Sequence, residues 1–252
     1  MANSTRNVIV GAANLFISNK NGDSRPDTKA ATITTLLGSG QSARSNLNSG
    51  TDYREVGYTS TGIEISYEPN YGEVMVDQLL DAARLFKQTL KVILKTELVE
   101  ATLENLTLSW GQSDFYINPA TGDPVWSLTN TGTSSTYRSD LNLAAGAVGD
   151  TPVERVLIAV GSSSRQVGSS YDPSSSGGTG AAVSPLHTSD LKQKERVYVA
   201  RRVVSIDTTA HGLKRDAATV FPVNFRCLPD DTQAEYAGTE YGVVIDRLWG
   251  TI

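Results

Sequence analysis

The chain has 252 residues, a length at which an all-β sandwich or barrel often forms one domain. Its formal net charge of −5 argues against a protein that grips nucleic acid by neutralising phosphates, because that task needs clustered lysine and arginine. Cys227 is the only cysteine, which excludes an intrachain disulfide and a zinc site built from cysteines, so folding in a reducing cytoplasm fits best.

The N-terminal segment "NVIVGAANLFI" (7–17) predicts a strand pair or one bent strand. Asn7 and Asn14 interrupt its apolar residues and only one basic residue precedes it, so we do not expect a secretion signal. No apolar run in the sequence approaches the length that spans a membrane, and we expect no membrane partner.

A long polar stretch follows from Ser18 to Arg54, and loops of this length in a compact domain are functional or disordered. Within it, Ile33, Leu36 and Leu37 stand out as apolar residues in a polar run. They can pack on their own domain or be buried against a neighbouring subunit, and the sequence leaves both alternatives open.

The next segments alternate polar and apolar residues, which predicts half-buried strands at "GIEISYE" (62–68), "EVMV" (73–76) and "TLKVILK" (89–95). The apolar faces of the three segments are Ile63, Ile65 and Tyr67, then Val74 and Val76, then Leu90, Val92 and Leu94. Four carboxylates lie on the opposite faces of the first two segments: Glu64, Glu68, Glu73 and Asp77.

Residues 96–111, "TELVEATLENLTLSWG", break the alternation and predict an amphipathic helix, the only well-formed helix in the chain. Thr96 is placed as its N-cap, Glu97 and Glu100 lie in its first turn, and Gly111 is placed to end it. A single apolar stripe should pack on a sheet: Val99, Leu103, Leu106 and Trp110.

Later segments predict four more strands, at 154–161, 195–206, 219–228 and 241–249. Two further polar stretches, 112–151 and 162–194, separate them from the helix and from one another. The second contains "SSYDPSSSGGTGAA", which has too few apolar residues to fold alone. The pattern as a whole predicts one mainly β domain over 1–252, with long loops at about 18–54, 112–151 and 162–194.

Residues that could carry chemistry are few. His187 and His211 both lie in turn-like or polar surroundings, and neither a nucleophile elbow nor a phosphate-binding loop is present. Two carboxylates on adjacent strands could form a glycosidase pair, but a solvated sheet face explains Glu64 and Glu73 more simply. We expect no enzyme, no metal site and no cofactor.

Five segments together resemble the tail tube proteins, also called major tail proteins, of long-tailed bacteriophages. They occur in that family's order and extend over nearly the whole chain: "EVGYTSTGIEISYEP" (55–69), "YGEVMVDQ" (71–78), "ELVEATLENL" (97–106), "FPVNFRCLPD" (221–230) and "YGVVID" (241–246). The stretches 112–151 and 162–194 look longer than a minimal member of that family needs.

The resemblance implies an antiparallel β-sandwich or partial barrel flanked by one α-helix, whose copies form six-fold rings that stack into a tube. Such a tube is a virion structure, made in the host cytoplasm, through which DNA is ejected into the host. Its partners would be further copies of itself, the tail terminator, the tape measure and the baseplate or tail-tip proteins, with DNA passing through transiently.

In such a ring, the hairpin carboxylates Glu64, Glu68, Glu73 and Asp77 would line the channel, and the helix would close the sandwich on the side away from it. Ile33, Leu36 and Leu37 would contact a neighbouring subunit. The alternative function is a β-sandwich binding module that recognises a receptor or glycan through its long loops. A hydrolase that uses Glu64 or Glu73 is a more distant third alternative.

Overall fold

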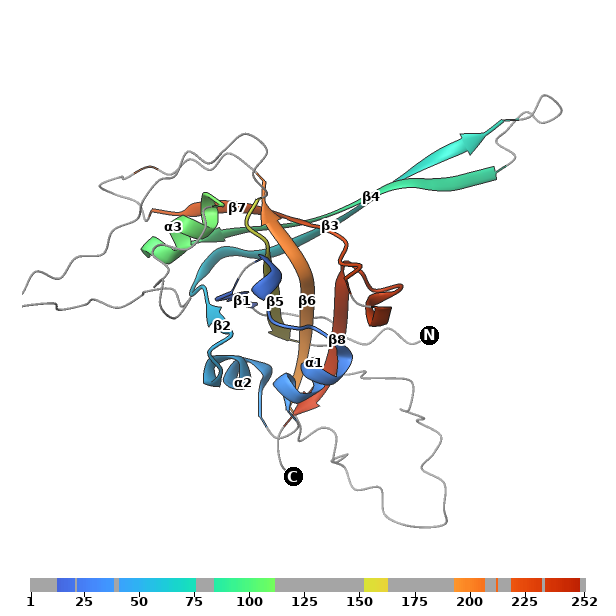
Figure 1. Cartoon of the computed structure of the whole chain (residues 1–252). Coiled ribbons are helices and arrows are strands. Elements are labelled where there is room, and N and C mark those ends of the chain that lie inside the picture. Colours follow the sequence, from blue (N-terminus) through green and yellow to red (C-terminus); the bar gives the residue numbers. More distant parts are fainter. Residues whose placement is uncertain are drawn as a thin grey trace, which may run out of the picture. The chain divides into compact units, whose positions relative to one another are not determined.

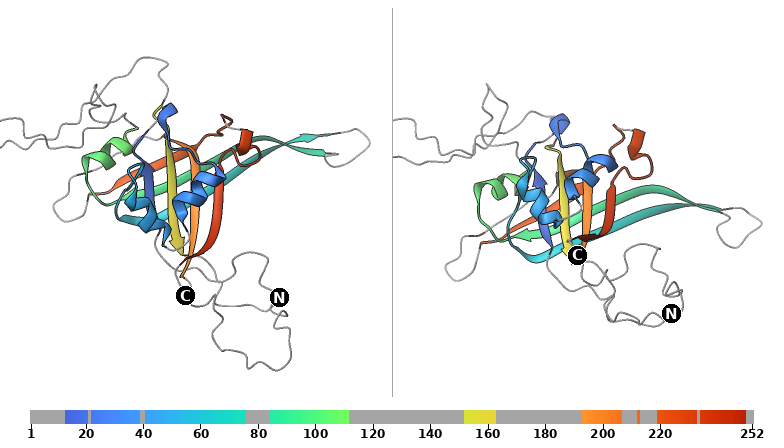
Figure 2. Two further views of the ribbon diagram at one scale, coloured as in Figure 1. Left: turned by 60° about the horizontal axis from the view of Figure 1, so that its bottom comes forward. Right: turned by 90° about the horizontal axis from the view of Figure 1, so that it is seen from below.

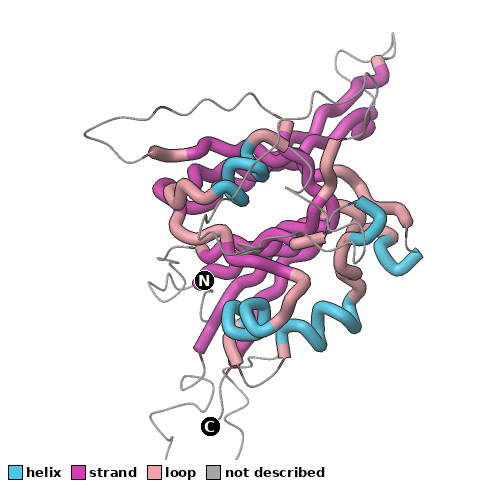
Figure 3. The backbone as a smooth tube through the Cα atoms, turned by 60° about the vertical axis from the view of Figure 1, so that its left-hand side comes forward, coloured by secondary structure: helices cyan, strands magenta, loops and turns pink. Residues whose placement is uncertain are grey.

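The structure is a computed structural model that describes residues 13–20, 22–38, 41–75, 84–111, 152–162, 193–206, 212, 219–232 and 234–249. The chain is mainly β, as the sequence predicts, and strands make up most of the described backbone in Figure 3. The single domain expected over 1–252 has two compact parts. We call Met1–Gly57, Arg155–Arg201 and Asp230–Ile252 unit 1, and Tyr58–Glu154 with Arg202–Pro229 unit 2.

Unit 1 contains a sheet with the strand order β2-β1-β5-β6-β8. β1 pairs antiparallel with both β2 and β5, and β6 pairs antiparallel with β8. The strands predicted at 154–161, 195–206 and 241–249 are confirmed, and β1 confirms the second half of the segment 7–17. The strands are β1 (Asn14–Ser18), β2 (Tyr53–Glu55), β5 (Arg155–Ser162), β6 (Gln193–Ser205) and β8 (Gly242–Trp249).

Two α-helices lie where the sequence predicts only a loop, in the stretch from residue 18 to residue 54. They are α1 (Ala30–Leu37) and α2 (Ala43–Ser49), preceded by the short 3-10 helix η2 (Gly22–Ser24). Ser42 caps α2 by accepting a hydrogen bond from the backbone N–H of Ser45. The expectation of one helix is therefore wrong, because capping and burial stabilise short helices that a polar composition conceals.

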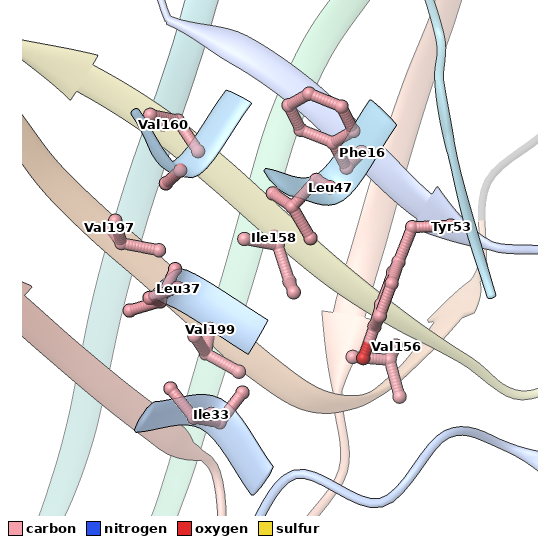
Figure 4. Packing of buried hydrophobic residues seen from close by; sticks show 11 residues of the cluster. Phe16, Ile33, Leu37, Leu47, Tyr53, Val156, Ile158, Val160, Val197 and Val199 are labelled. Atoms are coloured by element: carbon pink, nitrogen blue, oxygen red, sulfur yellow. The ribbon is translucent and has the colours of Figure 1, made fainter. Parts of the chain in front are cut away.

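One face of the unit 1 sheet and these two helices, drawn as ribbons in Figure 2, enclose a hydrophobic core whose side chains are shown in Figure 4. Ile33 and Leu37 of α1 and Leu47 of α2 pack with residues of β1, β2, β5 and β6. The strand residues of this core are Phe16, Tyr53, Val156, Ile158, Val160, Val197 and Val199. β5 is buried at every position from Arg155 to Val160, so it does not alternate between core and solvent as a half-buried strand does.

Unit 2 contains the strand order β6-β7-β4-β3, to which β6 contributes its last residues. β7 pairs antiparallel with β4 over Val92–Leu98 and with β6 over Val203–Ser205. These elements confirm the strands predicted at 62–68, 89–95 and 219–228, and β3 is longer than expected because it also takes in residues assigned to a separate strand. The elements are β3 (Thr59–Val74), β4 (Arg84–Leu98), α3 (Leu103–Ser109) and β7 (Phe221–Cys227).

α3 is shorter than predicted and begins later. β4 continues to Leu98, where Glu97 and Leu98 pair with Pro222 and Phe221 of β7. Residues that helical spacing assigned to the first turn of the predicted helix therefore belong to β4 and pair with β7. Thr96 is a strand residue, and Thr102 caps the helix instead by accepting from the N–H of Asn105.

The apolar stripe predicted on this helix is wrong. Val99 precedes α3, while Leu103, Leu106 and Trp110 are only half-buried. The buried face of α3 consists of Asn105, Thr107, Leu108 and Ser109. α3 lies against β7, and the Ser205 hydroxyl donates to the Ser109 carbonyl over 3.2 Å.

Candidate assembly surface

β3 and β4 form a long antiparallel hairpin whose register runs from Ile63 opposite Thr96 to Val74 opposite Arg84. β3 stands at the end of the strand order, so one of its edges has no neighbouring strand in the described part of the chain. β7 pairs with β4 only along Val92–Leu98, and beyond that point the hairpin continues as a two-stranded ribbon (Figure 1). The backbone donors and acceptors of an edge strand are a template for pairing with another chain.

One face of the hairpin is polar and carries charges of both signs. Glu64 lies directly opposite Lys95, Glu68 lies directly opposite Lys91, and all four residues are exposed. Opposite charges at facing positions of an antiparallel pair attract. Continued across β4 and β7, this polar face presents three carboxylates and three cations: Glu64, Glu68, Glu97, Lys91, Lys95 and Arg226.

Glu73 does not share this face, contrary to the sequence prediction. The sequence treats 62–68 and 73–76 as separate strands, whereas β3 is one strand of 16 residues. Side chains alternate along a strand, and Glu73 is separated from both Glu64 and Glu68 by an odd number of positions, so it points to the other side. Asp77 lies outside the described residues.

The opposite face of the hairpin is apolar and largely uncovered. Ile65, Tyr67 and Tyr71 share it, with exposed fractions of 41, 60 and 54 %. The sequence predicts Ile65 and Tyr67, with Ile63, as the apolar face of a half-buried strand, because alternation shows which residues share a face and not what covers them. Along β3, β4 and the adjoining residue 75, the exposed large apolar side chains are Ile65, Tyr67, Tyr71, Val74, Met75, Leu85 and Phe86. Exposed large apolar side chains gathered on one hairpin in this way are typical of an interaction site.

The residues expected to contact a neighbouring subunit lie elsewhere. Ile33 and Leu37 are 3 and 5 % exposed and belong to the core of unit 1, and Leu36 packs partly against the same core. Packing on their own domain, one of the two alternatives that the sequence leaves open, is therefore what the structure shows.

A buried ion pair in unit 1 was not foreseen from the sequence. Glu195 of β6 faces Arg247 of β8, with 2.8 Å between a carboxylate oxygen and Nε. The same carboxylate accepts the N–H of Ala43 at the start of α2, and Arg247 donates to the carbonyls of Leu37 and Gln41. Burial raises the pKa of Glu195, although the Ala43 hydrogen bond and Arg247 oppose that effect. This pair fastens the turn between α1 and α2 to the sheet.

A second buried polar cluster joins β6 to the loop before α1 and to the 3-10 helix η4 (Ala234–Tyr236) of unit 1. The Arg201 guanidinium lies 4.0 Å from the centre of the Tyr236 ring and donates to the Thr28 carbonyl and hydroxyl. The Tyr236 hydroxyl donates to Asp27 over 2.9 Å. Every member is joined to another polar group of the fold, which is the pattern of a structural network and not of an open site. No local motif could reveal it, since its residues come from sequence positions more than 150 apart.

The described residues contain no group of three or more histidine, cysteine, aspartate or glutamate side chains that could hold a metal ion. None of the helices in the described ranges is long and apolar enough to cross a membrane. His187 and His211 lie outside those ranges. In the described residues, the feature that most resembles a functional surface is thus the exposed hairpin.

Comparisons with known proteins do not place the chain in a family. No protein-family model matches it, and no curated protein matches it. What the protein does must be inferred from the hairpin, its free edge and its two contrasting faces.

Proposed function

We propose that this protein is the subunit of a bacteriophage tail tube, assembling as stacked hexameric rings into the conduit for DNA ejection. The observation that carries the proposal is the β3–β4 hairpin, which has an exposed apolar face and whose β3 edge has no neighbouring strand among the described residues. The resemblance of five segments to tail tube proteins supplies the kind of assembly and its six-fold symmetry.

The hairpin needs a partner for physical reasons. A two-stranded ribbon is marginally stable in water, and a third strand or a packed face is needed to hold it. Tyr67 and Tyr71 each leave more than half of their surface in solvent. Burying both rings and pairing the free edge of β3 in a second copy would stabilise the ribbon and join the two copies.

The edge of β3 in one copy would meet a different surface of the next, which makes the contact heterologous. Heterologous contacts that close under rotation give rings, and stacking of the rings gives a filament. A tube is therefore the assembly that removes the exposed edges of every copy.

The polar face suits the wall of a DNA channel. Each of Lys91 and Lys95 faces a carboxylate, so the surface offers phosphates no cluster of unopposed cations. A surface of clustered lysine would instead release counterions and bind DNA non-specifically. The charge balance supports a wall that lets DNA slide, although it is a mixed wall and not the purely acidic one expected from the sequence.

Electron microscopy of the concentrated protein tests the proposal. The wild type should form hollow tubes built from six-fold rings, and an Ile65→Ser, Tyr67→Ser double variant should remain a folded monomer. The matched control is Ser66→Ala, between the two on the polar face, which should form tubes normally. Discrete small oligomers or monomers of the wild type at every concentration would contradict the proposal and favour the binding-module alternative.

A further inference from the structure

The hairpin is not uniform along its length, because β4 contains a β-bulge. Asn70 lies opposite Thr89 and the next residue, Tyr71, lies opposite Lys87, so Gln88 is an extra residue in β4. From Lys87 back to Arg84, each β4 side chain therefore lies on the face opposite to the one that regular alternation would give it.

Two contacts show this exchange of faces directly. The Lys87 ammonium donates to the Tyr67 hydroxyl over 3.0 Å and lies 5.4 Å from the centre of its ring. Lys87 is therefore on the apolar face, although it continues the spacing of Lys91 and Lys95. On the polar face, Phe86 and Gln88 cover Gly72, where a Cβ would come within 3 Å of both side chains.

The outer part of the hairpin carries apolar groups on both sides. We call Tyr71–Val74 with Arg84–Gln88 the distal arm. One side of the distal arm shows Tyr71 and Leu85, and the other shows Val74 and Phe86. All four are exposed, Leu85 by 59 % and Phe86 by 46 %. Nearer to β7 the hairpin keeps one polar face and one apolar face.

A sheet with one apolar face needs one cover, whereas a ribbon with two apolar faces needs two. We propose that the distal arm is an insert that is buried on both faces between copies of this chain. The inference rests on the proposed function only in taking further copies as the partner.

Charge favours a second copy as that partner. The distal arm carries both signs, with Glu73 and Lys87 on one face and Arg84 near the other, so copies of the arm and its surroundings can approach without net repulsion. In the described structure, the exposed large apolar side chains are concentrated on the hairpin itself, with Tyr58, Ile206 and Val244 as the others. The same chain thus supplies apolar surfaces for the arm to meet.

Thiol labelling of assembled particles tests the two-sided burial. Cys227 is buried in β7, and burial raises its pKa to about 12, so the background reactivity is low. Single variants Val74→Cys and Leu85→Cys report on the two faces of the distal arm, and Glu68→Cys reports on the polar face nearer to β7. Each is mixed as a minor component with the wild type, so that assembly does not depend on the variant.

Positions 74 and 85 should both lose at least about tenfold in labelling rate on assembly, while position 68 stays accessible. If either 74 or 85 keeps its rate, the arm is covered on one side at most and the inference is overturned. If none of the three positions is labelled more slowly in intact tubes than in the isolated subunit, the hairpin does not lie in the interface. If no assembly forms at all, the proposed function is overturned together with this inference.

Discussion

The sheet of unit 1 and the hairpin of unit 2 are both built from antiparallel strands, but they differ in how far their side chains are exposed to solvent. In β5, residues Arg155 to Val160 are all buried, and α1 and α2 cover the core face of the sheet. In β3, most positions between Ser60 and Val74 are exposed, including Ile65, Tyr67, Tyr71 and Val74. The core face of unit 1 is covered by its own helices, whereas the apolar side chains of the hairpin remain exposed.

The largest expected effect comes from comparing the same phenylalanine-to-alanine substitution in the unit 1 core and in the hairpin. Phe16→Ala empties a fully buried position in the unit 1 core and should lower the free energy of unfolding by about 3–5 kcal/mol. Phe86→Ala removes a half-exposed ring from the hairpin and should change it by less than about 1 kcal/mol. Urea denaturation of both variants measures the difference. Equal losses would mean that the hairpin is already packed within its own chain.

Two cross-strand ion pairs on opposite faces of β6 and β8 sharpen the comparison within unit 1. Arg247→Met leaves Glu195 buried beside the start of α2 and should cost about 3 kcal/mol. Arg196→Met breaks the pair with Asp246, which is more exposed, and should cost about 0–1 kcal/mol. Thermal unfolding separates the two predictions. A larger loss from Arg196→Met would contradict the view that the Glu195 pair fastens the helices.

The polar face of the hairpin can be converted from balanced to basic. Glu64→Lys with Glu68→Lys leaves Glu97 as the single carboxylate among the six charges of the face, and assembled tubes should then bind duplex DNA at least about tenfold more tightly at low salt. The control Glu64→Gln with Glu68→Gln should show a smaller gain. Binding is measured by sedimentation with labelled DNA at two salt concentrations. Unchanged binding by the lysine variant would remove this face from the channel.

The smallest effect concerns the pH dependence of stability. Burial raises the pKa of Glu195 in the folded state, so the folded chain binds this proton more tightly than the unfolded chain does. Its contribution is fully present below the unfolded pKa of about 4.3 and is lost as pH rises through the raised folded value.

In Glu195→Gln this contribution is missing. The difference in unfolding free energy between wild type and variant should therefore shift against the wild type as pH rises through that window. Asp27 and Asp230 have lowered pKa values and act at more acidic pH, so they do not obscure the comparison. A difference that shifts in the opposite direction would mean that Arg247 outweighs burial.

Sequence reasoning recovered the elements of the fold better than their surroundings. Alternation located the strands around Ile65, Val92 and Phe225, because side-chain direction repeats every two residues whatever covers it. It could not tell that Ile65 is exposed and Phe225 buried, since burial depends on elements distant in the sequence.

Local rules also failed where tertiary pairing decides the outcome. Helical spacing assigned Thr96 and Glu97 to a helix, but pairing with β7 extends the strand through both. The Gln88 bulge moves Lys87 to the face of Tyr67, and no composition signal marks such an insertion. Among the carboxylates predicted to line a channel, Glu73 therefore lies on the opposite face of β3 from Glu64 and Glu68.

Hydrogen exchange compared between isolated subunits and assembled particles tests most directly whether copies join through the hairpin. Amides of Ser60–Val74 and Arg84–Lys91 should become strongly protected on assembly, while those of the β5 core are protected to the same extent in both states. Assembled particles in which the hairpin amides exchange as fast as in the isolated subunit would contradict the account.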